Sequence, residues 1–218
     1  NFDAISMLEN VAVNELAQTI NKEIVSKVKN LATTHAAAAA TAEGYSATLD
    51  LSAATYSGGF ENVTTAQRRL ASKMLESANL IYHRARFGAG TFAVVGAKVA
   101  SAMADAAGYS IAPFNNDLGS AAGTLYPAGK VYGLNVYVDP NLKFDDATVL
   151  IGRKGADEEP GLKFMPYIMA ESLQTISEGT FSPKIGMKSR YALVEAGWHP
   201  GTQYVQFSLA SGSLAKLA

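Results

Sequence analysis

The sequence predicts an α+β protein in which the helices come first and most strands come later. Two observations lead to this prediction: a long helical pattern near the start of the chain, and a series of short β-rich segments after residue 129. Segregated helices and strands are typical of α+β architectures rather than of repeated βαβ units. The chain has 218 residues, 48% of them hydrophobic, which is enough for one large domain or two small ones.

The first element is a helix predicted from about residue 4 to residue 33. Its apolar side chains recur mainly at steps of three and four residues, as expected when one stripe of a helix is buried. The stripe consists of Leu8, Val11, Leu16, Ile20, Ile24, Val28 and Leu31. We therefore expect Ile24→Asp to prevent folding, because it would place a charge on a buried surface. The alanine run at residues 36–40 has no large apolar residue to hold it, so we expect a connector there.

The remaining elements follow from apolar periodicity and turn residues. A second helix, capped by Thr64 or Thr65, extends to about Ala85, and a strand from Thr91 to Val95 precedes a short helix that Gly108 ends. Residues 46–55 are expected to form a short strand or loop, and Pro113–Gly129 a long surface loop. The later strands are predicted at residues 130–138, 147–151, 162–170, 185–195 and 203–209.

Composition excludes several classes of protein. The chain has no cysteine, which rules out disulfide scaffolds, thiol catalysis and cysteine-ligated zinc. Its formal net charge of −1 lacks the basic excess of a dedicated nucleic-acid binder. Apolar runs are all much shorter than the roughly 20 residues of a membrane-spanning helix. The chain begins at Asn1 rather than at a methionine, so we interpret it as a fragment.

Motifs for catalysis are not evident, and we expect no catalytic residue, no metal ligand set and no cofactor. Gly88-Ala89-Gly90 follows a predicted helix and precedes a strand, which reverses the order of a dinucleotide-binding loop. The three histidines are widely separated in the sequence, and no metal-binding spacing occurs. An enzyme would need a site assembled from distant residues, such as His83 or His199 with Asp145 or Glu195.

Two surface features are candidates for protein–protein contacts. Lys188, Arg190 and Tyr191 lie within a predicted strand. Arginine and tyrosine are enriched at interface hot spots, although a charged edge strand that discourages aggregation is an equal alternative. Trp198, in a predicted turn, suits a core or interface plug better than a ligand platform.

With these elements in order, the chain resembles the major capsid proteins of tailed bacteriophages, which share the Hong Kong 97 phage fold, and is most similar to the T-even myovirus type. Residues 16–31 resemble the spine helix of that family, and Gly90–Val95 resembles the axial-domain strand. Residues 130–139 resemble the strand that leads to Thr148–Gly152, and Phe181–Tyr191 resembles the return strand of the T-even type. The amino-terminal arm and extended loop of the family are absent from this chain.

The resemblance implies a division into three segments. Residues 1–56 would form a peripheral domain with the spine helix and a connector, residues 57–160 an axial domain, and residues 161–218 the return strands of the peripheral domain. In such a protein the loop from Pro113 to Gly129 would lie near a symmetry axis, which makes Asn115 and Asn116 further contact candidates.

The resemblance also implies a structural function without catalysis. Copies of the chain would form hexamers and pentamers that close into an icosahedral phage head, assembled in the host cytoplasm around double-stranded DNA. Decoration, scaffold and portal proteins are the implied partners, DNA would be enclosed without specific binding, and no membrane is involved. A shell protein of an encapsulin-like nanocompartment, which has the same fold, is the alternative.

Overall fold

The structure, a computed structural model, describes residues 4–51, 62–106, 108–111, 124–180 and 182–217. Within these ranges the protein has three α-helices, a seven-stranded mixed sheet and a separate two-stranded hairpin, which confirms the α+β class. The α-helices are α1 (Ala4–Ala42), α2 (Val63–Ala85) and α3 (Ala97–Met103). Two short 3-10 helices, η3 (Pro200–Gln203) and η4 (Leu214–Lys216), lie near the end of the chain. None of the helices in the described ranges combines the length and apolarity needed to cross a bilayer.

The large sheet has the strand order β1-β9-β6-β2-β5-β4-β3. Its pairs β1–β9 and β2–β5 are parallel, and the other four pairs are antiparallel. The strands of this sheet are β1 (Thr48–Leu49), β2 (Phe92–Val95), β3 (Tyr109–Ile111), β4 (Tyr126–Val131), β5 (Leu134–Val138), β6 (Thr148–Gly152) and β9 (Tyr204–Leu209).

Helices cover both faces of this sheet, because neighbouring residues of each strand point to opposite faces. Ala93 and Val95 of β2 belong to the larger apolar cluster, which includes the buried side chains of α2 and α3. Val94, between them, belongs to a second cluster with Val28 and Ala32 of α1. The sheet is therefore enclosed between α2 with α3 on one side and the second half of α1 on the other.

Helix α1 is longer than the sequence pattern indicates. It continues through the alanine run to Ala42, so the predicted end near residue 33 is wrong, and the run whose conformation the sequence left open is helical. Alanine has the highest intrinsic helix propensity, and this propensity extends the helix although the run lacks large apolar side chains. At 1.5 Å per residue, its 39 residues give a length of about 58 Å.

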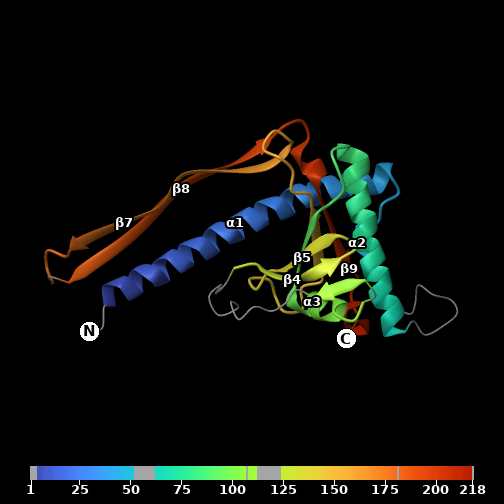
Figure 1. Ribbon diagram of the computed structural model, residues 1–218, viewed down its shortest axis with the longest axis horizontal. Coiled ribbons are helices and arrows are strands. Elements are labelled where there is room, and N and C mark those ends of the chain that lie inside the picture. Colours follow the sequence, from blue (N-terminus) through green and yellow to red (C-terminus); the bar gives the residue numbers. More distant parts are fainter. Residues whose placement is uncertain (1–3, 52–61, 107, 112–123, 181, 218) are drawn as a thin grey trace.

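Only part of the apolar stripe on α1 is buried. Leu8 and Val11, in the first half, are 60% and 58% exposed, whereas Val25, Val28 and Ala32 are buried. Figure 1 shows the reason: the first half of α1 projects beyond the sheet and runs beside the hairpin instead of over the core.

One predicted strand is in fact a hairpin. Residues 130–138 were expected to be continuous, but β4 ends at Val131 and β5 begins at Leu134. Tyr132 and Gly133 between them have φ angles of 45° and 85°, so both lie in the left-handed region that a two-residue type I′ turn requires. A tyrosine at such a position is unusual, which is why the sequence did not indicate the turn. Strand β4 also occupies the end of the predicted loop, and β3 was not predicted.

The separate hairpin consists of β7 (Gly161–Ile176) and β8 (Pro183–Ala196), which pair antiparallel along nearly their whole length. Both strands are longer than the sequence predicts. The pairing register shifts twice, after Pro166 and after Ile168. Together with the first half of α1, the hairpin forms a projecting structure that we call the arm (Figure 1).

These burial data revise the expected effect of a charge on α1. Val28 is buried against the sheet, so Val28→Asp should lower the free energy of unfolding by more than about 4 kcal/mol. Ile24 is only half-buried, so Ile24→Asp should cost about 1–2 kcal/mol and leave the protein folded. Urea unfolding of both variants measures the difference. Equal destabilisation would contradict the arrangement of α1 on the sheet.

Candidate functional site

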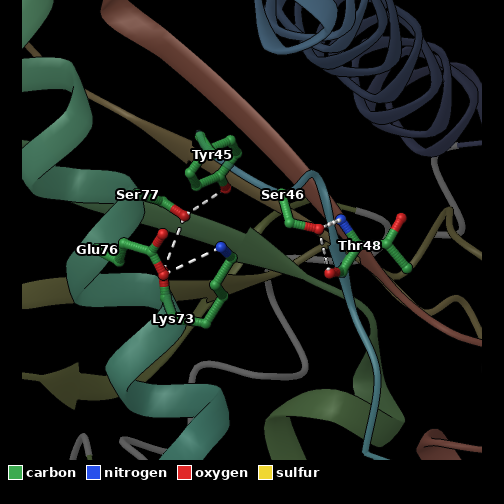
Figure 2. A network of polar contacts seen from close by, with 6 residues as sticks. All are labelled: Tyr45, Ser46, Thr48, Lys73, Glu76 and Ser77. Carbon is green, nitrogen blue, oxygen red and sulfur yellow. Dashed lines mark hydrogen bonds and ion pairs between the residues drawn. The ribbon is translucent and has the colours of Figure 1, made fainter. Parts of the chain in front are cut away.

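Three regions of the described chain have the polar groups or uncovered apolar surface that a function would need. The first is a buried polar network that joins the segment after α1 to α2 (Figure 2). The hydroxyl groups of Tyr45 and Ser77 are 2.7 Å apart, and the Ser77 hydroxyl donates to the backbone carbonyl of Lys73. Because that bond uses the only Ser77 hydroxyl hydrogen, Tyr45 is the donor in the first bond.

Lys73 completes this network. Its ammonium lies 4.1 Å from the centre of the Tyr45 ring, a cation–π contact, and 3.0 Å from a carboxylate oxygen of Glu76. Burial raises the pKa of Tyr45 from 10.0 to about 12, so the phenol is neutral at physiological pH. Every polar group of the network thus serves a neighbour within the fold. We conclude that the network fixes the end of α1 to α2.

The second region is the contact between α1 and the hairpin, which depends on polar pairs along the arm. Glu9 accepts a hydrogen bond of 2.8 Å from Gln174, near the far end of the hairpin. Closer to the sheet, Glu23 accepts a hydrogen bond from Tyr191, and this bond raises the pKa of the tyrosine. Lys27 forms an ion pair of 2.6 Å with Glu195 at the base of the hairpin. These polar contacts, together with half-buried side chains of β8, hold the hairpin beside the helix.

The third region is a cleft of about 570 Å³ where α1, the hairpin base and the end of the sheet meet. Its apolar floor includes Ile24, Phe92, Tyr137 and Leu162, which pack against the second apolar cluster but are only half-buried. Polar side chains from the loop after β6 and from the start of β7 line its rim: Arg153, Lys154, Asp157 and Lys163.

The rim of this cleft is fixed by hydrogen bonds. Arg153 forms an ion pair of 2.5 Å with Glu159 and also donates to the carbonyl of Phe87. The hydrogen bond from Arg153 lowers the pKa of Glu159. Lys163 donates to the carbonyl of Ala156 at 2.8 Å, and the backbone N–H of Lys154 donates to the Thr91 hydroxyl. The cleft is therefore apolar at its floor and fixed and predominantly cationic at its rim.

The hypothesis of an enzyme assembled from distant residues finds no support in the described part of the chain. Glu195 pairs with Lys27, and His199 contacts the edge of the Trp198 ring. Among the described residues, no hydrogen bond or ion pair joins any two of His83, His199, Asp145 and Glu195, and no group of three or more acidic, histidine or cysteine side chains could hold a metal.

The contact candidates predicted from sequence have different environments. On β8 the odd-numbered residues from 185 to 193 are half-buried and face α1, whereas Lys188 and Arg190 lie on the opposite, exposed face. Tyr191 faces α1, where it bonds to Glu23 and its ring lies 5.4 Å from that of Phe164. Trp198 is 86% exposed. Asn115 and Asn116 lie outside the described residues.

Sequence reasoning missed several large apolar side chains that are exposed. Six lie on β7, the most exposed being Tyr167 at 79%; the six are Phe164, Met165, Tyr167, Met169, Leu173 and Ile176. Phe144, in the loop between β5 and β6, is 70% exposed. The unbroken apolar run from residue 164 to 170 was the available signal, because a strand covered on one face only should alternate between apolar and polar residues.

Comparison with known proteins identifies the class. Residues 1–213 match the family model described as Major capsid protein Gp23. Similar proteins include the major capsid protein of Vibrio phage KVP40, 28% identical over 207 residues that cover 88% of this chain and 38% of that protein. The major capsid protein of Salmonella phage ViI is 34% identical over 128 residues, covering 55% of this chain and 28% of that protein.

The chain thus belongs to the Gp23 family of phage major capsid proteins, which are structural proteins of the virion and not enzymes. The resemblance seen in the sequence is confirmed, and the phage capsid is favoured over the nanocompartment alternative. The chain spans less than two fifths of the length of the curated relatives named above.

The pKa of Tyr45 predicts a pH dependence of stability. Because its pKa is higher in the folded protein than the unfolded value of 10.0, the stabilisation by neutral Tyr45 is complete below pH 10 and is lost as the pH rises toward 12. Between pH 9 and pH 11.5, we expect the free energy of unfolding of the wild type to fall by about 2 kcal/mol more than that of Tyr45→Phe. Urea unfolding at both pH values measures this difference.

At neutral pH the same variant should be less stable than the wild type by about 1 kcal/mol, since it lacks the hydrogen bond to Ser77. Tyr204, whose pKa burial also raises, is present in both proteins and contributes equally. The same alkaline loss in the two proteins would show that Tyr45 is not its source.

Proposed function

We propose that this chain is the shell-forming part of a phage major capsid protein, and that its copies assemble as hexamers and pentamers into an icosahedral head around double-stranded DNA. The proposal rests on one observation above all: the arm exposes large apolar side chains that the described part of the chain leaves uncovered. Several large apolar side chains exposed on one element are typical of protein–protein interfaces. Family membership supports self-assembly as the process that covers it.

We further infer that the architecture is the Hong Kong 97 phage type. Helix α1 would be the spine helix, and the arm would belong to a peripheral domain formed by residues 1–56 and 161–218. Strands β2 to β6 would form the centre of an axial domain within residues 57–160. Strand β9 pairs with β6, so the large sheet would connect the two domains rigidly.

Enclosure of DNA requires no specific site on this chain. A net charge of −1 suits a wall that contains DNA without strong neutralisation of its phosphates. Decoration, scaffold and portal proteins are further proposed partners of the assembled shell. The described cleft and arm surfaces would serve contacts between copies, with Lys188, Arg190 and Trp198 as exposed candidates.

Arg190→Ala tests the assembly function of the hairpin. Arg190 is exposed on the face of β8 that points away from α1, so its removal should change the free energy of unfolding by less than about 0.5 kcal/mol. If Arg190 is an interface hot spot, the concentration needed for assembly should rise about tenfold or more. Sedimentation velocity and negative-stain electron microscopy measure assembly, and thermal melting measures folding.

Lys130→Ala is the matched control, because Lys130 is an exposed cation on a strand outside the arm. The control should assemble like the wild type. An Arg190→Ala protein that melts several degrees earlier but assembles normally would contradict the proposed contact. A wild-type protein that stays monomeric at all concentrations would contradict the proposed function itself.

A further inference from the structure

The cleft and the Phe144 loop, residues 139–147, lie at opposite ends of the same three central strands. At one end, Phe92 of β2 pairs with Asn135 of β5 and with Gly152 of β6, beside the cleft. At the other end, β5 leads into the Phe144 loop and β6 begins directly after it. Strand β5 alone separates the two ends by about 16 Å, at roughly 3.3 Å per residue. The two surfaces therefore do not meet within one chain.

The Phe144 loop presents its aromatic ring from a rigid support. The carboxylate of buried Asp139 accepts a hydrogen bond from the Asn141 backbone, and the carboxylate of Asp146 accepts two from Thr148. The backbone N–H of Lys98, on α3, donates to the carbonyl of Phe144. Because the backbone of the loop is already fixed, a large apolar side chain exposed on it loses little further conformational freedom on binding. Phe144 is therefore preorganised as an anchor.

The cleft has the matching chemistry. Its floor offers half-buried apolar side chains to an aromatic ring. On its rim, the Arg153 and Lys163 side chains already have partners, whereas the exposed Lys154 ammonium forms no ion pair with any residue that the structure describes. An acidic residue beside the incoming ring would supply that partner. Asp145, exposed and directly after Phe144, is such a residue, and Lys143 on the other side of the ring is also exposed.

We propose that the Phe144 loop of one copy docks into the cleft of a second copy, with Phe144 on the apolar floor and Asp145 next to Lys154. This inference rests on the proposed self-assembly. Because the two surfaces differ and face opposite ends of the sheet, the contact is heterologous, and a heterologous contact that closes produces a ring. Charge complementarity between Asp145 and Lys154 fixes the register of the two copies.

Cysteine cross-linking tests the contact directly, since the chain has no cysteine of its own. Asp145→Cys and Lys154→Cys are prepared as separate full-length variants, mixed under conditions in which the wild type assembles, and treated with a short bis-maleimide cross-linker. An ion pair between an aspartate and a lysine leaves the two Cα atoms farther apart than the roughly 4.4–6.8 Å that a disulfide requires, so a short bifunctional reagent bridges the two thiols. Only positions that approach each other closely in the assembly then give a covalent dimer. We expect the dimer in the mixture and not in either variant alone.

Tyr132→Cys mixed with Lys154→Cys is the matched control, because Tyr132 is an exposed aromatic residue in the turn that precedes β5, at the cleft end of the strand. Equal cross-linking in the control overturns the proposal, and so does a mixture that assembles without cross-linking. Cross-linking of Lys154→Cys to Trp198→Cys in place of Asp145→Cys also overturns it, since the exposed tryptophan would then be the occupant.

A charge exchange provides an independent measurement. Asp145→Lys and Lys154→Glu should each raise the concentration needed for assembly about tenfold, and the double variant should restore it, with melting temperatures unchanged. Phe144→Ser should weaken assembly at least as much, whereas Tyr132→Ser should not. If the wild type assembles and these variants need no higher concentration to do so, this inference is overturned and the proposed function is not. A wild type that does not assemble overturns the proposed function and this contact together.

Discussion

The packing of α1 on the large sheet is the constraint on which the rest of the structure depends. Val28 and Ala32 meet Val94, Leu150 and Tyr204 in a small apolar cluster on the face opposite α2. Ala32 is fully buried, and its small side chain allows the helix backbone to approach the strands closely. The Tyr45 network then fixes the chain just after the helix to α2. A helix held at one end in this way can project its other half rigidly into solvent.

The arm combines this rigid helix with a hairpin that has little core of its own. Two strands alone are marginally stable in water, so the hairpin needs the helix beside it. The contacts between them combine polar pairs spaced along α1, from Glu9 to Lys27, with apolar side chains of β8 that are only half-buried. Exposed pairs of this kind contribute little energy each. The large apolar side chains of β7 are thus left for a surface outside the chain.

The sequence predicted the classes and approximate positions of the main elements because apolar periodicity reports local geometry directly. It placed the start of α1 and most of α2, and it indicated every strand of the sheet except β3 and β4. Periodicity could not reveal that Leu8 and Val11 remain mostly exposed, because a stripe shows which face is apolar but not what covers it. The turn at Tyr132 was missed because its left-handed conformation falls on a residue that rarely adopts it.

The candidate surfaces were predictable only in part, because a local pattern shows which face of an element a residue occupies but not what lies against that face. Arg190 and Lys188 were identified because cations within a strand are conspicuous, and the alternation of β8 does place them on the exposed face. Tyr191, one residue further, points to α1 because successive side chains of a strand face opposite ways. The cleft depends on α1, β5 and β7 meeting in space, which no local pattern encodes.

The sequence left two interpretations of the cations on the outer face of the hairpin: contacts with a partner, or charges that discourage aggregation. The structure makes the two compatible. An exposed two-stranded ribbon with apolar side chains would pair indiscriminately unless charges opposed flat, unspecific contacts. Lys188, although paired with Glu171, is 63% exposed in its side chain, and Arg190 lies on the same face. A partner must present groups that satisfy these charges while it covers the neighbouring apolar side chains, so a random apolar surface is rejected. The charges that discourage aggregation are therefore the same ones that select a specific partner.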